Sequence, residues 1–459
     1  MRARHRRIGP VVALAGIVLF AACGPGTPAP APVQAPAPAP PPASPTTPPA
    51  PTTTAPPSSP APAARACTST SSSSSGSPAA SEAPPLSDAQ AVAEAEAAYA
   101  TAPDRLPDGG VPLVTIERRD GHLAIQTTPV HSAEEATATA AEAAQGDDLV
   151  AVVPDQRVAA RGLARTRTSA TSANDTDRSQ QWALDRAGFE ASWADSDGSG
   201  VKVAVIDTGV QSSHPDLAGQ VLPGYRFWHA GSVPNSAPMN PAFDDQGHGT
   251  HVAGIVSAIA NNAQGIAGGA PGACILPVKV LDSTGSGWDS DVARGIDWAV
   301  VNGAKVINLS LGGSSPGASG VAVDDAVASD VLVFAAAGNG GAGGAPEYPG
   351  ANPNAIAVAS VTSALTRSSF STTGSYVDIA APGSGIWSTY PTSTYASLSG
   401  TSMATPYAAA TGALIRARFP SWTVAQARQR LLGTADDLGP TGPDVEYGYG
   451  FIDPFEATR

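Results

Sequence analysis

From about residue 175 onward, apolar segments of strand length alternate with segments that have the apolar spacing of a helix. Continuously apolar strands that alternate with helices are typical of a parallel sheet covered on both faces. The pattern therefore predicts an α/β domain with a mainly parallel central sheet. We expect strands at 201–206, 274–281, 305–309, 331–336 and 355–361, helices at 251–260, 291–301 and 321–329, and two closing helices that begin near 402 and 424.

A smaller unit with a different pattern precedes this domain. Apolar and β-branched residues at 113–117, 123–126 and 149–153 predict three strands, and the Ala- and Glu-rich segment 132–144 predicts a helix. These elements indicate a small α+β unit. It is followed by the basic and then Ser/Thr-rich segment RGLARTRTSATSAND, which is typical of an exposed, cleavable connection.

The first residues have the pattern of an export signal. Several arginines precede the apolar stretch 11–20, which is shorter than the ~20 apolar residues needed to span a bilayer. Cys23 ends the run LFAAC, which resembles a bacterial lipoprotein signal and favours lipidation of this cysteine; a plain cleavable signal is the alternative. From 24 to about 85 the chain is dominated by Pro, Ala, Ser and Thr, and we expect a disordered linker there.

Charge and cysteine content narrow the functional classes. The net charge of −14 and the lack of a basic patch argue against nucleic acid as a partner. Beyond Cys23, the only cysteines are Cys67 and Cys274. Because Cys67 lies in low-complexity sequence, we expect no disulfide framework.

Three short segments supply an aspartate, a histidine and a serine in that chain order. They are VAVIDTGV with Asp207, GHGTHVAG with His248 and SGTSMATP with Ser402. Taken singly, Asp207 fits a turn, His248 a helix start and Ser402 an N-cap. Together the three residue types form an orienting acid, a general base and a nucleophile. His251, one helical turn after His248, should face the helix packing and has no catalytic role.

Asn339, in AAAGNGG, adds a fourth polar residue at the end of an apolar segment. Viewed alone, it is as readily a turn asparagine in a glycine-rich loop. Beside the other three residues it is a fourth member of the set, and the flanking glycines permit close approach.

The chain resembles the subtilisin-like serine peptidases, and within them the thermitase-like branch. The resemblance runs from about Gln181 to Tyr447 and includes HGTHVAGIVSAIANNAQGIAG, PVKVLDSTGSG, INLSLGG and GTSMATP in order. It implies a three-layer subtilisin-like domain at 175–459. It also implies an endopeptidase in which Ser402 is the nucleophile, His248 the base, Asp207 the orienting acid and Asn339 part of the oxyanion hole.

The resemblance also implies how a polypeptide substrate is held. It places an extended peptide between Ser310-Leu311-Gly312 and Gly285-Ser286-Gly287, where glycine leaves room for the substrate backbone; these glycines otherwise fit ordinary turns. It puts Glu347 near the floor of the pocket for the residue before the cut. A carboxylate there would favour Lys or Arg, and an idle, exposed glutamate is the alternative.

Structural calcium is the cofactor that the resemblance implies, and no organic cofactor is expected. Calcium takes six to eight oxygen ligands, and the alternative is a surface turn rich in Asn and Gly. The candidate ligands are the side chains of Asp175, Asp216 and Asn262 and the backbone carbonyls of Ile259, Gln264 and Ile266.

The same resemblance implies a propeptide at 86–168 before the catalytic domain at 175–459. With the signal peptide at 1–23 and the linker at 24–85, these segments give the expected order of the chain. We expect an extracellular or surface-anchored monomer that is first made as a zymogen and that contacts the membrane only through a lipid at Cys23. The alternatives are a processing protease of narrow specificity, which the insertion at 224–243 favours, and a non-catalytic peptide-binding relative. Loss of a site residue would have favoured the latter, and none is lost.

Overall fold

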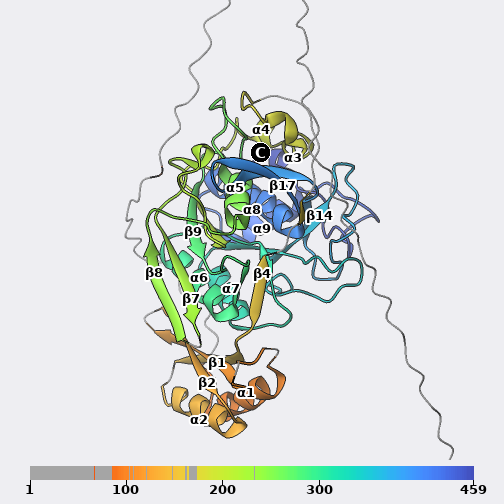
Figure 1. Ribbon diagram of the computed structural model, residues 1–459. Coiled ribbons are helices and arrows are strands. Elements are labelled where there is room, and N and C mark those ends of the chain that lie inside the picture. Colours follow the sequence, from red (N-terminus) through yellow and green to blue (C-terminus); the bar gives the residue numbers. More distant parts are fainter. Residues whose placement is uncertain are drawn as a thin grey trace, which may run out of the picture. The chain divides into compact units, whose positions relative to one another are not determined.

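The computed structural model describes residue 67 and residues 85–459, apart from 103, 107, 120, 147, 161–162, 165–172 and 232 (Figure 1). The predicted signal, Cys23, most of the linker and most of the predicted cleavable connection lie outside the described residues. None of the helices described is long and apolar enough to cross a membrane.

An eight-stranded sheet forms the centre of the molecule. All neighbouring strands whose pairing is described run parallel except the last two, which form an antiparallel hairpin. The predicted α/β class and the five predicted strands are confirmed. In spatial order the strands are β15 (Ile379–Pro382), β14 (Ile356–Val361), β13 (Leu332–Ala336), β11 (Val306–Leu309), β6 (Lys202–Asp207), β9 (Cys274–Lys279), β7 (Gly224–Ala230) and β8 (Val233–Met239).

Helices cover both faces of this sheet. Since successive strand residues point to opposite sides, alternate residues of one strand contact the helices on each face. In β6, Val203 and Val205 pack in the apolar cluster that contains α5 (His248–Ser257) and α8 (Thr401–Arg418). The intervening Ala204 and Ile206 pack in a second cluster with α6 (Asp289–Val301) and α7 (Ala318–Ala328). The result is three layers, with helices on both sides of a sheet whose central strands β6, β11 and β13 are buried almost throughout.

Several elements were not predicted. The insertion at 224–243 forms the β7–β8 hairpin, although β8 contains two prolines and few apolar residues. A second antiparallel sheet joins β16 (Ile386–Tyr390), β17 (Thr394–Ser399) and β5 (Leu163–Ala164). The other unpredicted elements are η1 (Arg178–Gln180), α3 (Trp182–Ala187), α4 (Phe189–Ser192), η2 (Pro215–Leu217) and α10 (Pro454–Ala457). The second predicted closing helix, near 424, is confirmed as α9 (Val424–Gly433).

Residues 85–154 form the expected α+β arrangement, here called the N-terminal module. Its antiparallel sheet has the order β2-β1-β3, and two helices pack on one face. The other face packs on α6 and α7, since Val114 and Ile116 belong to the same apolar cluster as those helices. The elements are α1 (Asp88–Thr101), β1 (Val111–Arg119), β2 (His122–Val130), α2 (Ala133–Ala143) and β3 (Leu149–Pro154).

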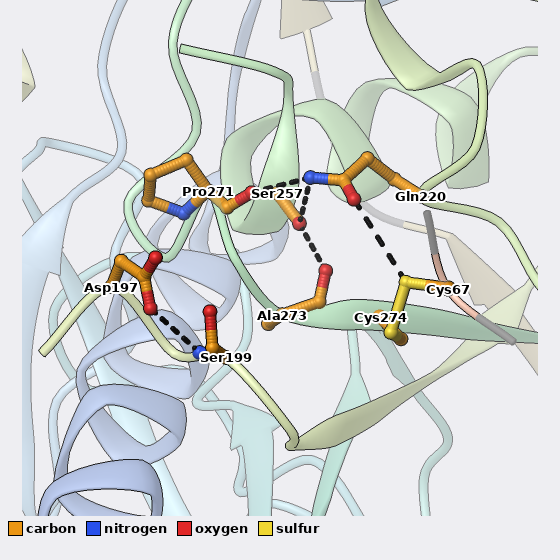
Figure 2. Close-up of a disulfide and its surroundings, with 8 residues drawn as sticks. All are labelled: Cys67, Asp197, Ser199, Gln220, Ser257, Pro271, Ala273 and Cys274. Atoms are coloured by element: carbon orange, nitrogen blue, oxygen red, sulfur yellow. Dashed lines mark hydrogen bonds between the residues drawn. A yellow bond between two sulfur atoms is a disulfide. The ribbon is translucent and has the colours of Figure 1, made fainter. Parts of the chain in front are cut away.

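The expectation that the cysteines form no disulfide is wrong. Cys67 and Cys274 are bonded to each other across 207 positions of sequence, with Cα atoms 5.8 Å apart (Figure 2). The backbone N–H of Cys67 also donates to Gly219 O at 2.9 Å. Low-complexity sequence around one cysteine says nothing about which residues meet in space, so the pairing was not accessible from spacing alone.

Candidate active site

Asp207 and His248 form a buried pair at the carboxyl edge of the central sheet. Asp207 is the last residue of β6, and His248 is the first residue of α5. His248 Nδ1 lies 2.8 and 2.9 Å from the two carboxylate oxygens of Asp207, and the two residues are 5% and 0% exposed. Because the carboxylate accepts, Nδ1 carries the proton. Nε2 is therefore the basic nitrogen of the ring.

The approach of α5 to the end of β6 depends on a glycine. A side-chain carbon at Gly249 would lie 2.1 Å from Gly209 O and 3.1 Å from Asp207 Cβ. Any other residue would push His248 away from its carboxylate. His251 points elsewhere, and its Nε2 lies 3.1 Å from the carbonyls of Ile386 and Ala396. Burial lowers the pKa of His251 to about 3, so this ring is neutral.

Ser402 lies in the first turn of α8. Gly400 is at the N-cap and the helix begins at Thr401, so the interpretation of Ser402 as the N-cap is wrong. Ser402 Oγ donates to Ser310 O at 3.0 Å, and Ser310 Oγ donates to Ser402 O at 2.8 Å. A helix N-terminus presents N–H groups without helical partners and a partial positive charge. The serine therefore lies where a developing anion is stabilised.

Asn339 is held at the same helix end. It follows β13, and its Oδ1 accepts hydrogen bonds from Thr401 N and Thr401 Oγ1, both at 3.0 Å. With the oxygen engaged by two donors, the amide NH₂ is the donating end of the side chain. Because α8 packs on α5 and on β13, this amide, Ser402 and His248 come from neighbouring elements. The site can therefore serve acyl transfer.

The two segments expected to hold an extended peptide hold a strand of the chain itself. β4 (Arg157–Ala160) runs antiparallel between β10 (Ser286–Trp288) and β12 (Leu311–Gly312). Ser286 pairs with Ala159, and Leu311 pairs with Ala160. Gly285 lies just before β10, in a turn closed by its N–H to Asp282 O at 3.0 Å. The groove is therefore built for main-chain pairing.

Glu347 is half-buried beside this groove. A side-chain carbon at Gly312 would lie 2.5 Å from Glu347 Oε2, and one at Gly338 would lie 2.9 Å from Oε1. The Asn339 N–H donates to Oε1 at 3.4 Å. The carboxylate thus lies between β12 and the loop that carries Asn339.

The structure brings together the carboxylates expected to hold calcium. Asp175 accepts from the N–H groups of Asn261 and Asn262, both at 2.9 Å, and Asp216 accepts from Asn262 Nδ2 at 2.8 Å and Ile266 N at 2.7 Å. Burial raises the pKa of Asp216 to about 6, and the charge of Asp175 adds to the effect. Among the described residues no group of three or more His, Cys, Asp or Glu residues could hold a metal ion. Two neighbouring carboxylates nonetheless supply the charged oxygens that a hard cation such as calcium prefers.

One polar cluster was missed by sequence reasoning. Asp155, just after the N-terminal module, accepts from Ser290 N at 2.8 Å and from Ser290 Oγ at the first turn of α6. His229, in the β7–β8 hairpin, has Nε2 3.8 Å from Asp155 Oδ2 and Nδ1 2.9 Å from Asp291 Oδ2. Burial raises the pKa of Asp155 to about 7, and the neighbouring Asp289 adds to this. No local sequence signal marks Asp155, because the cluster exists only when the three elements meet.

Comparisons with known proteins agree with this architecture. The model of the subtilase family matches residues 198–450. Thermitase of Thermoactinomyces vulgaris is 50% identical over 283 residues, which cover 61% of this chain and 96% of that protein. Subtilisin of Bacillus pumilus is 49% identical over 259 residues, 56% of this chain and 90% of that protein. Subtilisin Savinase of Lederbergia lenta is 48% identical over 264 residues, 57% of this chain and 92% of that protein. The chain belongs to the subtilase family and is a serine endopeptidase.

Proposed function

We propose that Ser402, His248, Asp207 and Asn339 carry out peptide hydrolysis through an acyl-enzyme. The observation that carries this proposal is the buried Asp207–His248 pair beside the first turn of α8. Ser402 Oγ attacks the scissile carbonyl carbon as His248 Nε2 takes the hydroxyl proton, while Asp207 holds the ring and stabilises the imidazolium. The Asn339 amide and the Ser402 N–H stabilise the oxyanion. The C–N bond then breaks, the leaving amine takes the proton from His248, and water releases the acyl group by the same route.

The pairing of β4 suggests which bond is presented to the serine. A peptide that pairs as β4 does has one residue opposite Leu311, and the next residue falls opposite Ser310, whose carbonyl accepts from Ser402 Oγ. In this sequence the residue after Ala160 is Arg161, which lies outside the described residues. We infer that the enzyme cuts its own chain after Arg161, and that Glu347 favours arginine or lysine at that position.

With that cut, residues 86–161 of the predicted propeptide 86–168 act as the propeptide. Its β4 occupies the groove that a substrate needs, so the uncut chain is a zymogen. Capping of α6 by Asp155 and the packing of the sheet on α6 and α7 would support the folding of the catalytic domain. Export through the signal at 1–23 and lipidation at Cys23 complete the proposal for a monomeric extracellular enzyme held at the cell surface; both rest on sequence alone.

Calcium is proposed as a structural ion. Asp175 and Asp216 would supply the charged oxygens, with the Asn262 side chain and the carbonyls of Ile259, Gln264 and Ile266 as further ligands. When bound, the ion would neutralise two crowded carboxylates and fix the loop after α5 to the segment before η1. It has no part in the catalytic step.

A processing protease of narrow specificity remains the second candidate. The β7–β8 hairpin favours it, because Trp228 and His229 line a cleft together with β10. A non-catalytic peptide-binding role is disfavoured, since the residues proposed as nucleophile, base, acid and oxyanion donor are all present.

The test compares the wild type with Ser402→Ala on a denatured protein and on a Val-Ala-Ala-Arg anilide peptide. Ser369→Ala, which alters an exposed serine, is the matched control and should retain full activity. We expect Ser402→Ala to lose hydrolysis of both substrates and to stay uncut. Activity that survives in Ser402→Ala would contradict the proposed nucleophile. A leucine peptide cut faster than the arginine peptide would contradict only the proposed role of Glu347 and not that of Ser402.

A further inference from the structure

The disulfide joins two parts of the chain that the proposed maturation cut separates. Cys67 precedes the N-terminal module, and Cys274 opens β9 in the middle of the catalytic domain. Every bond between Ala160 and Ala173 lies between these two cysteines in sequence. A cut in this connection therefore leaves one half of the disulfide on each product.

The disulfide attaches Cys67 to the central sheet and not to the N-terminal module. Cys274 pairs with Lys202 of β6, and its N–H donates to Val201 O at 2.9 Å. Cys67 and Cys274 are both partly buried against the apolar cluster that contains β9, and the Cys67 N–H is bonded to Gly219 O. Figure 2 shows the two sulfurs beside Gln220, whose Oε1 lies 3.8 Å from Cys67 Sγ. The link therefore does not depend on whether the module stays docked.

We propose that the mature enzyme is a two-chain protein in which the Cys67–Cys274 disulfide keeps the N-terminal segment on the catalytic domain after the propeptide is cut. The inference rests on the proposed self-cleavage. Along the chain the order is signal cysteine, linker, propeptide and catalytic domain. Without a crosslink, one cut after the propeptide would detach the catalytic domain from everything that precedes it. With the crosslink, residues 24–67 and any lipid at Cys23 stay attached.

The same geometry makes the propeptide a covalently held inhibitor after the first cut. A tethered segment rebinds at an effective concentration of about millimolar for a short flexible connection, so a cut module would tend to return to the groove. Full activity then requires a second cut between Cys67 and Asp155, which removes the module and leaves the segment that ends at Cys67 in place. Retention of the anchor and removal of the inhibitor thus become separate events.

The test uses the full chain with an epitope tag inserted in the linker before Cys67. Samples are treated with a thiol-blocking reagent and run with and without dithiothreitol. We expect the tag to migrate with the catalytic domain without reductant and to appear on a separate, smaller fragment with reductant. In Cys67→Ser the tag should be lost from the catalytic domain in both lanes. A tag that separates from wild-type enzyme without reductant would overturn the inference.

A second arm separates this outcome from failure of the proposed self-cleavage. In the Ser402→Ala chain, residues 166–172 are replaced by the recognition sequence of an added site-specific protease. After that protease cuts, the tag should remain with the catalytic domain until reductant is added, and it should be released at once when Cys67→Ser is combined with Ser402→Ala. Release without reductant in the parent chain overturns the inference whatever the wild type does. Absence of a cut in the wild type, with retention in this arm, overturns only the self-cleavage.

Discussion

Asp155 gives the sharpest pH-dependent prediction. Its carboxyl is fully buried against the first turn of α6, with His229, Asp289 and Asp291 around it. Burial raises its pKa from 3.8 to about 7, and this difference corresponds to about 4 kcal/mol at 1.36 kcal/mol per pKa unit. Because the folded state favours the protonated carboxyl, the contribution of Asp155 to the free energy of unfolding is fully present below pH 3.8. It is lost as the pH rises through about 7.

Asp155→Asn removes this titration and keeps a neutral acceptor for Ser290. We compare Ser402→Ala with Ser402→Ala/Asp155→Asn, so that self-cleavage does not intervene, by urea denaturation at pH 4 and pH 8. The asparagine variant should be more stable by less than ~1 kcal/mol at pH 4 and by roughly 4 kcal/mol at pH 8. Asp148→Asn, at an exposed carboxylate of the N-terminal module, is the control, and its effect on stability should show no such growth with pH. Equal stabilisation at both pH values would refute the reasoning.

Three further predictions concern the site itself. Glu347→Gln should lower kcat/KM for the arginine peptide by about 10²–10³-fold and change kcat/KM for a leucine peptide by no more than a few-fold. The reason is that a charge pair at about 4 Å is worth about 4 kcal/mol at an effective dielectric near 20. Equal losses of kcat/KM on both peptides would argue against a specificity role. Asn339→Ala should lower kcat by about 10²–10³-fold with little change in KM, which is the figure known for the oxyanion asparagine of subtilisin. EDTA should lower the melting temperature and calcium should restore it. Asp216→Asn should abolish that response, and an unchanged melting temperature in EDTA would contradict the proposal of a structural calcium ion.

The sequence predicted the central sheet well because a buried parallel strand is apolar along its whole length. The five predicted strands agree with β6, β9, β11, β13 and β14 to within two residues at each end. The β7–β8 hairpin gave no such signal. Val233–Met239 reads VPNSAPM, and its pairing with β7 depends on the edge position that tolerates proline.

The candidate site was recognisable from the sequence as residue types in motifs, and its geometry was not. Nothing local indicated that Thr401 fixes the Asn339 amide or that Glu347 lies beside Gly312 and Gly338. The Asp155 cluster and the Cys67–Cys274 bond were invisible for the same reason. Both join residues distant in sequence, and their partners are decided only when the chain folds.

The central claim is that Ser402 is the nucleophile of a working peptidase. The most direct measurement is mass spectrometry of the peptides from wild-type enzyme treated with a serine-directed fluorophosphonate, with heat-denatured enzyme as the control. We expect one adduct, on the peptide that contains Ser402, in native enzyme only, and its loss in His248→Ala. A label on another serine, or no label on enzyme that still hydrolyses peptides, would contradict it.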